Sequence, residues 1–273
     1  MLGVLMRTLA VLLALFVSSP MDSRVFHARA DDYWAGTGMT FETAQALNAH
    51  LKTMDPYAEL VPRARVQALL GDATDIQIRE RDAILNIRLG RFARGTCRAI
   101  ESHLGGKIVG VVLDLRGNPG GYLEEAECVA RIFLGPREIV RKHPVPSRVA
   151  KSFGLPMLGP FAENSIVPRL LSDLPLVVVI DGHSKSASEV VAAAIQDYRR
   201  GTLIGQHSFG KDTSQILEPL PTNDQLILVR TVARLKRPLG GDRTHGIEPD
   251  IKITGPDLLT RARNIILRDG PRT

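Results

Sequence analysis

Several features that would narrow the function of this chain are missing from it. The 273 residues include only two cysteines, Cys97 and Cys128, and neither has the spacing to histidine that a zinc site requires. The H-E-x-x-H pattern of zinc proteases is also absent, so we expect no metal and no other cofactor. There is no run of like charges and no interleaving of basic with aromatic residues, which argues against nucleic-acid binding despite a net charge of +6. The remaining composition, 44% hydrophobic and 23% charged without internal repeats, is typical of a globular protein.

The N-terminus lacks an apolar run long enough to span a bilayer easily. Its apolar segment, residues 8–17, follows Arg7 and precedes small residues, which is the order of a secretory signal. The small-x-small triplet 28–30 offers a cleavage site, so we expect residues 1–30 to be a signal peptide and the protein to be periplasmic or extracellular. Cleavage nearer Ser19, or an uncleaved N-terminal membrane anchor, is the alternative.

Export would place the two cysteines in an oxidising compartment, where a disulfide between them is permitted. Both fall in predicted helices beside the same predicted strand. Two buried thiols that never pair are an equal alternative, because free cysteine also prefers the interior.

Apolar periodicity predicts strands that alternate with helices. Two strands, residues 108–115 and 174–180, are apolar almost throughout, which is typical of parallel strands covered on both faces. We therefore expect an α/β fold with a largely parallel sheet flanked by helices. The Pro-rich residues 135–173 are predicted to cross the surface without regular structure, and residues 79–82 to form a turn. The other predicted strands are 76–78, 84–89, 202–205, 215–220 and 225–235. The predicted helices are 40–54, 96–103, 124–134 and 188–199. We expect three domains: an N-terminal helical segment at 31–75, a core at 76–255 and a C-terminal helix or tail at 256–273.

Two turns, residues 116–121 and 181–186, follow the apolar strands at the end of the sheet where reactive groups gather. Ser186 precedes a helix, so the amide of Ala187 has no intrahelical acceptor and can face a developing oxyanion. A serine that only caps the helix is the ordinary alternative. The N-P-G-G turn at 118–121 lets backbone amides approach a substrate, or is simply a tight turn.

Lys211 lies in a glycine-flanked turn after a further strand. A lysine can deprotonate a serine such as Ser186 only while it is uncharged, and desolvation beside Phe209 would lower its pKa towards neutrality. Gln215 could orient the amine or the hydroxyl. Asp197, near the end of the helix, could hold the lysine or serve as a structural acid. An exposed lysine is the alternative for Lys211.

The motifs D-L-R-G-N-P-G-G, S-K-S-A-S-E, Q-D-Y, F-G-K and G-I-E-P-D occur in this order between Ile84 and Ile253. Together they resemble the C-terminal processing, or tail-specific, serine proteases, and M-D-P-Y-A at 54–58 resembles that family's L-D-P-Y-S segment. The resemblance implies a ClpP/crotonase-like α/β core, polypeptide substrates and a Ser-Lys dyad. Carried over by position, it implies a nucleophile at Ser186, a general base at Lys211, a supporting glutamine at Gln215, a supporting aspartate at Asp197, oxyanion donors at Gly120 and Ala187, and substrate contact at Gly121.

The chain departs from that family at three points, one of which is that residues 135–173 do not resemble it closely. The family usually carries a PDZ domain between the D-P-Y segment and the strand 84–89, where this chain has only about twenty residues after Leu60, too few for a domain. We therefore expect a short form, with its mode of substrate recognition and any activator or adaptor protein left open. Lys185 stands where the family often has alanine, and its ammonium would lower the pKa of Lys211 or face solvent.

These observations predict an exported serine endopeptidase. Three alternatives stay open. One is a catalytically weak or inactive binding protein on the same fold. Another is an esterase or acyl-transfer enzyme that uses the same serine. The third is a Ser-His mechanism through His183 or His207, which flank the dyad in the sequence.

Overall fold

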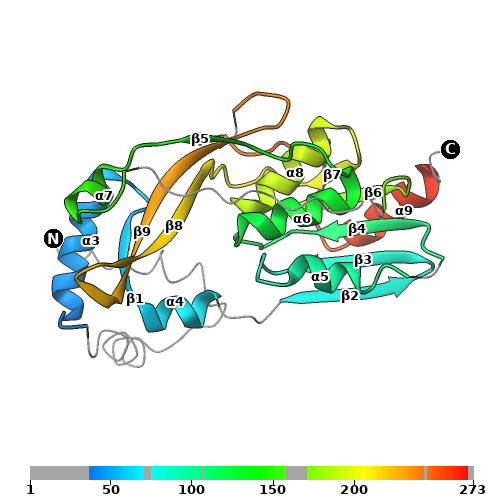
Figure 1. The fold of residues 1–273 in the computed structure, drawn as a ribbon. Helices are drawn as coiled ribbons and strands as arrows, with labels where there is room; N and C mark the ends of the chain where they lie inside the picture. The colour runs from blue at the N-terminus through cyan, green and yellow to red at the C-terminus, as the bar shows by residue number, and fades with distance from the viewer. Residues whose placement is uncertain (1–36, 71–74, 106, 158–170, 243–244, 270–273) are drawn as a thin grey trace.

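The computed structural model describes residues 37–70, 75–105, 107–157, 171–242 and 245–269 (Figure 1). The predicted signal peptide, residues 1–30, lies outside this part of the chain. None of the helices within it is long and apolar enough to cross a membrane. In chain order the elements are α3 (Phe41–Met54), β1 (Glu59–Pro62), α4 (Arg63–Leu70), β2 (Ile76–Arg81), β3 (Ile84–Leu89), α5 (Thr96–Glu101), β4 (Gly110–Asp114), α6 (Leu123–Leu134), β5 (Arg141–Pro144), α7 (Arg148–Ser152), β6 (Leu176–Ile180), α8 (Ala187–Asp197), β7 (Thr202–Gly205), β8 (Thr213–Leu220), β9 (Asn223–Lys236), β10 (Ile251–Lys252) and α9 (Leu258–Asp269).

A six-stranded sheet in the order β10-β7-β6-β4-β3-β2 forms the larger layer. All neighbouring strands in it are parallel except β2 and β3, which are antiparallel, so the predicted largely parallel α/β fold is confirmed. The central strands β4 and β6 are buried at every residue. Their side chains alternate: Leu113 and Val178 pack towards α5, α6 and α8, whereas Val112 and Val177 pack towards α9. Helices on both faces explain why these strands are apolar without interruption.

A second sheet is built around the long strand β9, which pairs antiparallel with β1, β5 and β8. Helices α3 and α7 pack with it through a separate apolar cluster that includes Leu51, Leu60 and Leu228. The prediction that residues 135–173 lack regular structure is wrong at β5 and α7. Strand β5 is mostly exposed and has no apolar alternation, so only its pairing with β9 marks it as a strand.

The hairpin of β2 and β3 is tighter than the predicted turn at 79–82. Strand β2 continues to Arg81, and only Asp82 and Ala83 connect the strands. Both residues are left-handed, with φ of 53° and 59°. A two-residue loop of this kind matches the twist of antiparallel strands, which is why the charged residues before it can stay in the strand.

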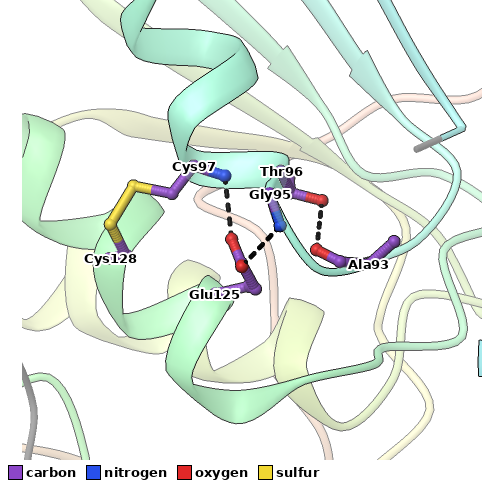
Figure 2. Close-up of a disulfide and its surroundings, with 6 residues drawn as sticks. All are labelled: Ala93, Gly95, Thr96, Cys97, Glu125 and Cys128. Atoms are coloured by element: carbon purple, nitrogen blue, oxygen red, sulfur yellow. Dashed lines mark hydrogen bonds between the residues drawn. A yellow bond between two sulfur atoms is a disulfide. The ribbon is translucent and has the colours of Figure 1, made fainter. Parts of the chain in front are cut away.

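A disulfide joins Cys97 of α5 to Cys128 of α6 (Figure 2). Glu125 of α6 adds a polar link beside it, because its carboxylate accepts from the N–H groups of Gly95 and Cys97 at 2.7 and 2.9 Å. The first of these amides lies at the start of a helix and has no intrahelical acceptor. The question left open by the sequence is thus decided in favour of a covalent link between α5 and α6.

Candidate active site

Ser186 lies in the turn between β6 and α8, immediately before the first residue of the helix. Its backbone is left-handed, with φ 57° and ψ −113°, a conformation that costs free energy for a residue other than glycine. Such strain persists only where the surroundings hold it. One of the restraints is the Ser186 N–H, which donates to the Glu189 carboxylate at 2.8 Å.

The serines on either side of Ser186 connect its turn to the turn after β4. Ser184 donates its hydroxyl to the carbonyl oxygen of Leu115 at 2.8 Å. Ser188 donates its hydroxyl to the carbonyl oxygen of Asn118 at 3.0 Å, and Lys185 donates its N–H to the same oxygen at 3.1 Å. The two turns predicted to carry the chemistry therefore form one hydrogen-bonded unit.

Gly120 brings the N-P-G-G turn against the start of α8. A methyl group added at Gly120 would lie 2.9 Å from the Cβ of Ser186 and 3.1 Å from the amide nitrogen of Ala187. Together with a φ of 101°, this close approach requires glycine. The N–H of Gly120 donates to the Asn118 side chain at 2.8 Å, while Gly121 packs its backbone against Phe92. The turn therefore lies beside Ser186, with the Gly120 amide engaged inside the turn itself.

Glu189 is a site residue that the sequence analysis missed. Its side chain is fully buried, and its Oε1 accepts from the hydroxyl of Ser208 and the N–H of Gly210, both at 2.6 Å. Its Oε2 accepts from the N–H groups of Ser186 at 2.8 Å and Lys211 at 2.9 Å. One carboxylate thus holds the backbone of the serine turn and of the lysine turn. The S-x-x-E spacing of a capping box was the available signal, but it points only to a helix start.

Lys211 has an environment suited to a base. Burial lowers the pKa of its amine to about 8, with a further lowering from the Lys185 ammonium, while Glu189 and Asp55 act in the opposite direction. Its Nζ lies 4.9 Å from the centre of the Tyr57 ring. The Lys185 ammonium thus acts on the pKa of Lys211 in the direction expected from the sequence.

The aromatic neighbour of Lys211 differs from the one expected. The sequence suggested Phe209, but the ring of Phe209 lies 5.2 Å from the Nζ of Lys185 and is 52% exposed. Tyr57, from the turn between α3 and β1, is the ring beside Lys211. Phe209 is near Lys211 in sequence, whereas Tyr57 reaches it from a different part of the chain.

Gln215 lies on β8 and directs its side-chain amide towards β9. Its Nε2 donates to the hydroxyls of Thr213 and Thr231 at 2.9 and 3.2 Å. Thr231 in turn donates its N–H and its hydroxyl to the Asp55 carboxylate at 2.8 and 3.0 Å. The predicted supporting glutamine is thus part of a network that fixes the turn carrying Tyr57.

Asp197 pairs with Arg237 and not with Lys211. Its Oδ1 accepts from the Arg237 guanidinium at 2.8 and 2.5 Å, and its Oδ2 accepts from the N–H of Leu239. The reason is geometric: Asp197 lies eleven positions after Ser186, a rise of roughly 16 Å along the axis of α8. In this structure Asp197 anchors the segment after β9.

His183 and His207, which flank the Ser186 turn in the sequence, each lie near an acidic side chain. His183 lies 4.0 Å from Asp181, and His207 lies 3.9 Å from Glu248. Among the described residues, no group of three His, Cys, Asp or Glu side chains could hold a metal ion. The serine turn is connected to the Lys211 turn through the Glu189 carboxylate, which accepts from the N–H groups of Ser186 and Lys211.

Residues 84–253, well over half of the chain, match the model of peptidase family S41. The chain belongs to peptidase family S41. It is 40% identical over 151 residues to a carboxy-terminal-processing protease of Bartonella bacilliformis, which covers 55% of this chain and 32% of that protein. It is 39% identical over 140 residues to a carboxyl-terminal-processing protease of a Picosynechococcus species, with 51% and 30% covered.

A solved photosystem II D1 C-terminal processing protease has the same fold over part of its length. It is 28% identical to this S41 chain with a TM-score of 0.50, covering 67% of this chain and 46% of that one. The expected ClpP/crotonase-like fold is therefore confirmed. The chain spans about a third of the length of the two curated relatives it matches.

Proposed function

We propose that this S41 chain is an exported serine endopeptidase that hydrolyses peptide bonds in polypeptide substrates with Ser186 and Lys211. The observation that carries the proposal is the shared carboxylate of Glu189. It accepts hydrogen bonds from the backbone N–H groups of Ser186 and Lys211. Burial at the same time lowers the pKa of the Lys211 amine to about 8. A serine needs a nearby base to become a nucleophile, and a lysine can be that base only when burial keeps part of it uncharged.

In the first step, the uncharged amine of Lys211 takes the proton of the Ser186 hydroxyl as its oxygen attacks the peptide carbonyl carbon. The Ala187 N–H at the start of α8 faces the negative charge that develops on the carbonyl oxygen. The Gly120 N–H becomes the second donor only when it leaves the Asn118 side chain, to which it donates in this structure. The ammonium of Lys211 then protonates the departing amine. Water hydrolyses the acyl-enzyme by the same proton transfers in reverse order.

Two features support export. The sequence of residues 1–30 has the order of a secretory signal, and the disulfide between Cys97 and Cys128 is of a kind that persists in oxidising compartments. The proposal therefore places the mature enzyme in the periplasm or outside the cell. An activator or adaptor protein that assists it would act in the same compartment.

The test compares the wild-type protein with Ser186→Ala and Lys211→Met on an unfolded, casein-like substrate, with fragments identified by mass spectrometry. Both variants should lose at least about a thousandfold in kcat/KM, because the two groups act as a unit. The controls Ser172→Ala and Lys252→Ala remove exposed side chains of the same kinds and should cleave like the wild type. Near-wild-type proteolysis by either dyad variant would overturn the assignment.

Lys211→Met also gives a stability measurement that separates loss of the base from loss of the fold. The pKa of Lys211 is lower in the folded state than in the unfolded chain, so the buried ammonium destabilises the fold at pH values below about 8. Removing it should raise the free energy of unfolding at pH 7 by on the order of 1–3 kcal/mol. The gain should shrink as the pH rises through 8 and vanish above 10.5, where the lysine is uncharged in both states.

A further inference from the structure

The D-P-Y turn at residues 55–57 lies beside the proposed base, and the proposed mechanism gives it no role. It connects α3 to β1, and both of these elements pack with β8 and β9, apart from the six-stranded sheet that leads to Ser186 (Figure 1). From this turn the ring of Tyr57 reaches the Lys211 amine, with 4.9 Å between Nζ and the ring centre. The smaller sheet thus contributes a side chain beside the proposed base.

The backbone around Tyr57 is held in place on both sides. Its N–H donates to the Asp55 carboxylate at 3.0 Å, and that carboxylate also accepts both donors of Thr231 from β9. On the other side, Ala58 and Leu60 are buried in the apolar cluster of α3 and β9. Tyr57 itself is 38% exposed, and its ring is oriented by the anchored turn, by the groups it covers and by the contact of its hydroxyl with the Thr213 side chain.

The charged groups that face the Lys211 amine come from three directions. Lys185 approaches from the turn before α8, Glu189 from α8 itself, and Asp55 from the turn after α3. The two carboxylates favour the ammonium, so burial has to outweigh them for the base to function. Tyr57 adds burial without adding charge. Burial raises the pKa of its phenol above the ordinary value of 10, which keeps the ring neutral over the range in which Lys211 titrates.

We propose that Tyr57 is a positioning residue of the peptidase, whose ring forms the wall that keeps water from the Lys211 amine. This inference rests on the proposed role of Lys211 as the base. The ring face also attracts an ammonium weakly, which favours the charged form, but admitting water to a buried amine has the larger effect. Loss of the ring should therefore make Lys211 harder to deprotonate, whereas loss of the hydroxyl alone should not.

The first arm of the test measures kcat/KM against pH for the wild type, Tyr57→Ala and Tyr57→Phe. In Tyr57→Ala the rising limb should move to higher pH by about one unit, a loss of about tenfold at pH 7 that disappears at alkaline pH. Tyr57→Phe keeps the wall and should reproduce the wild-type curve. A uniform loss at every pH, or a Phe variant that behaves like Ala, would overturn the proposal. If Tyr57→Ala does not fold, Tyr57→Leu replaces it, with a smaller shift expected in the same direction and an unmoved limb counting against the wall.

The second arm needs no turnover. In a Ser186→Ala background, the rate at which fluorodinitrobenzene labels Lys211 is followed against pH by peptide mass spectrometry, with exposed Lys252 as the internal reference. The midpoint for Lys211 should rise in Tyr57→Ala and stay in place in Tyr57→Phe. An unchanged midpoint refutes the wall even if the enzyme is a protease. A shifted midpoint in a protein that never cleaves peptides supports the wall and refutes the proposed function instead.

Discussion

Ser186 adopts a left-handed backbone between two serines that have structural tasks. The hydroxyls of Ser184 and Ser188 both donate to carbonyl oxygens of the turn after β4, so they are engaged in joining the two turns. The fixed turn then holds the strained residue in place. A repeated serine pattern that suggests helix capping therefore separates into two anchors and one proposed nucleophile.

Glu189 gives the first residue-scale prediction. Glu189→Gln keeps the size of the side chain but replaces one acceptor oxygen by an NH₂ group that faces N–H donors. We expect a loss of about 2–4 kcal/mol in the free energy of unfolding, since donors buried without acceptors are costly. We also expect at least a tenfold drop in kcat/KM, because the serine and lysine turns lose their common anchor.

The matched control for this variant is Glu138→Gln, which removes a 51% exposed partner of Arg141. A surface ion pair of this kind should contribute less than about 1 kcal/mol. Chemical denaturation and kcat/KM measured on the same samples give both quantities. Wild-type activity in Glu189→Gln would show that the carboxylate does not position Ser186 and Lys211 for the proposed reaction.

At this scale the sequence allowed us to select Ser186 and Lys211 as candidates, because their turns follow apolar strands and match a known order of motifs. Glu189 and Tyr57 escaped selection for a common reason. Their tasks depend on contacts with Lys211 that only the folded chain creates, and local sequence favours a helix cap for one and a surface turn for the other. For Asp197 the sequence left a structural role and a role beside the lysine open, and in the folded chain it pairs with Arg237.

At the scale of elements, the long apolar strands β4 and β6 were predictable because helices cover both of their faces. Strand β5 and helix α7 were not. The exposed β5 depends on its pairing with β9, and α7 has only five residues, too few for an apolar stripe. Regular structure of this kind follows from tertiary contacts more than from local pattern.

The link between α5 and α6 gives a prediction for these elements. Reduction of the disulfide, or Cys97→Ser with Cys128→Ser, should lower the free energy of unfolding by about 3–4 kcal/mol for a separation of 31 residues. Denaturant unfolding with and without dithiothreitol measures it. The double serine variant serves as the control, because reductant should leave it unchanged. Equal stability of the oxidised and reduced wild type would show that Glu125 and packing alone hold the helices together.

At the scale of the molecule, the candidate site combines side chains from the six-stranded and the four-stranded sheet. The parallel sheet leads to Ser186, while the smaller sheet supplies Tyr57 and the network of Gln215, Thr231 and Asp55. The sequence predicted the parallel sheet. It did not predict that residues near 57 would lie beside residue 211, because no local pattern encodes a pairing between β1 and β9.

Substrate choice is also a property of the whole molecule. Between β1 and β2, the described chain holds the eight-residue helix α4, and the interval between the two strands is far too short for a PDZ domain. A preference for a free C-terminus would then not come from a domain inserted between these two strands. We therefore expect the isolated enzyme to cleave a peptide internally without regard to its terminal carboxylate.

The measurement uses two peptides of identical sequence, one with a free C-terminal carboxylate and one with a C-terminal amide. Their kcat/KM values for the same internal bond should agree within about twofold, because a distant terminus that is not bound contributes nothing to transition-state binding. Ser186→Ala with each peptide gives the background rate. A drop of tenfold or more on amidation corresponds to about 1.4 kcal/mol of binding energy that depends on the carboxylate. It would mean that the chain itself recognises the terminal carboxylate of a peptide. The ammonium of Lys185, which lies in the Ser186 turn and acts on Lys211, would then be the first group to replace.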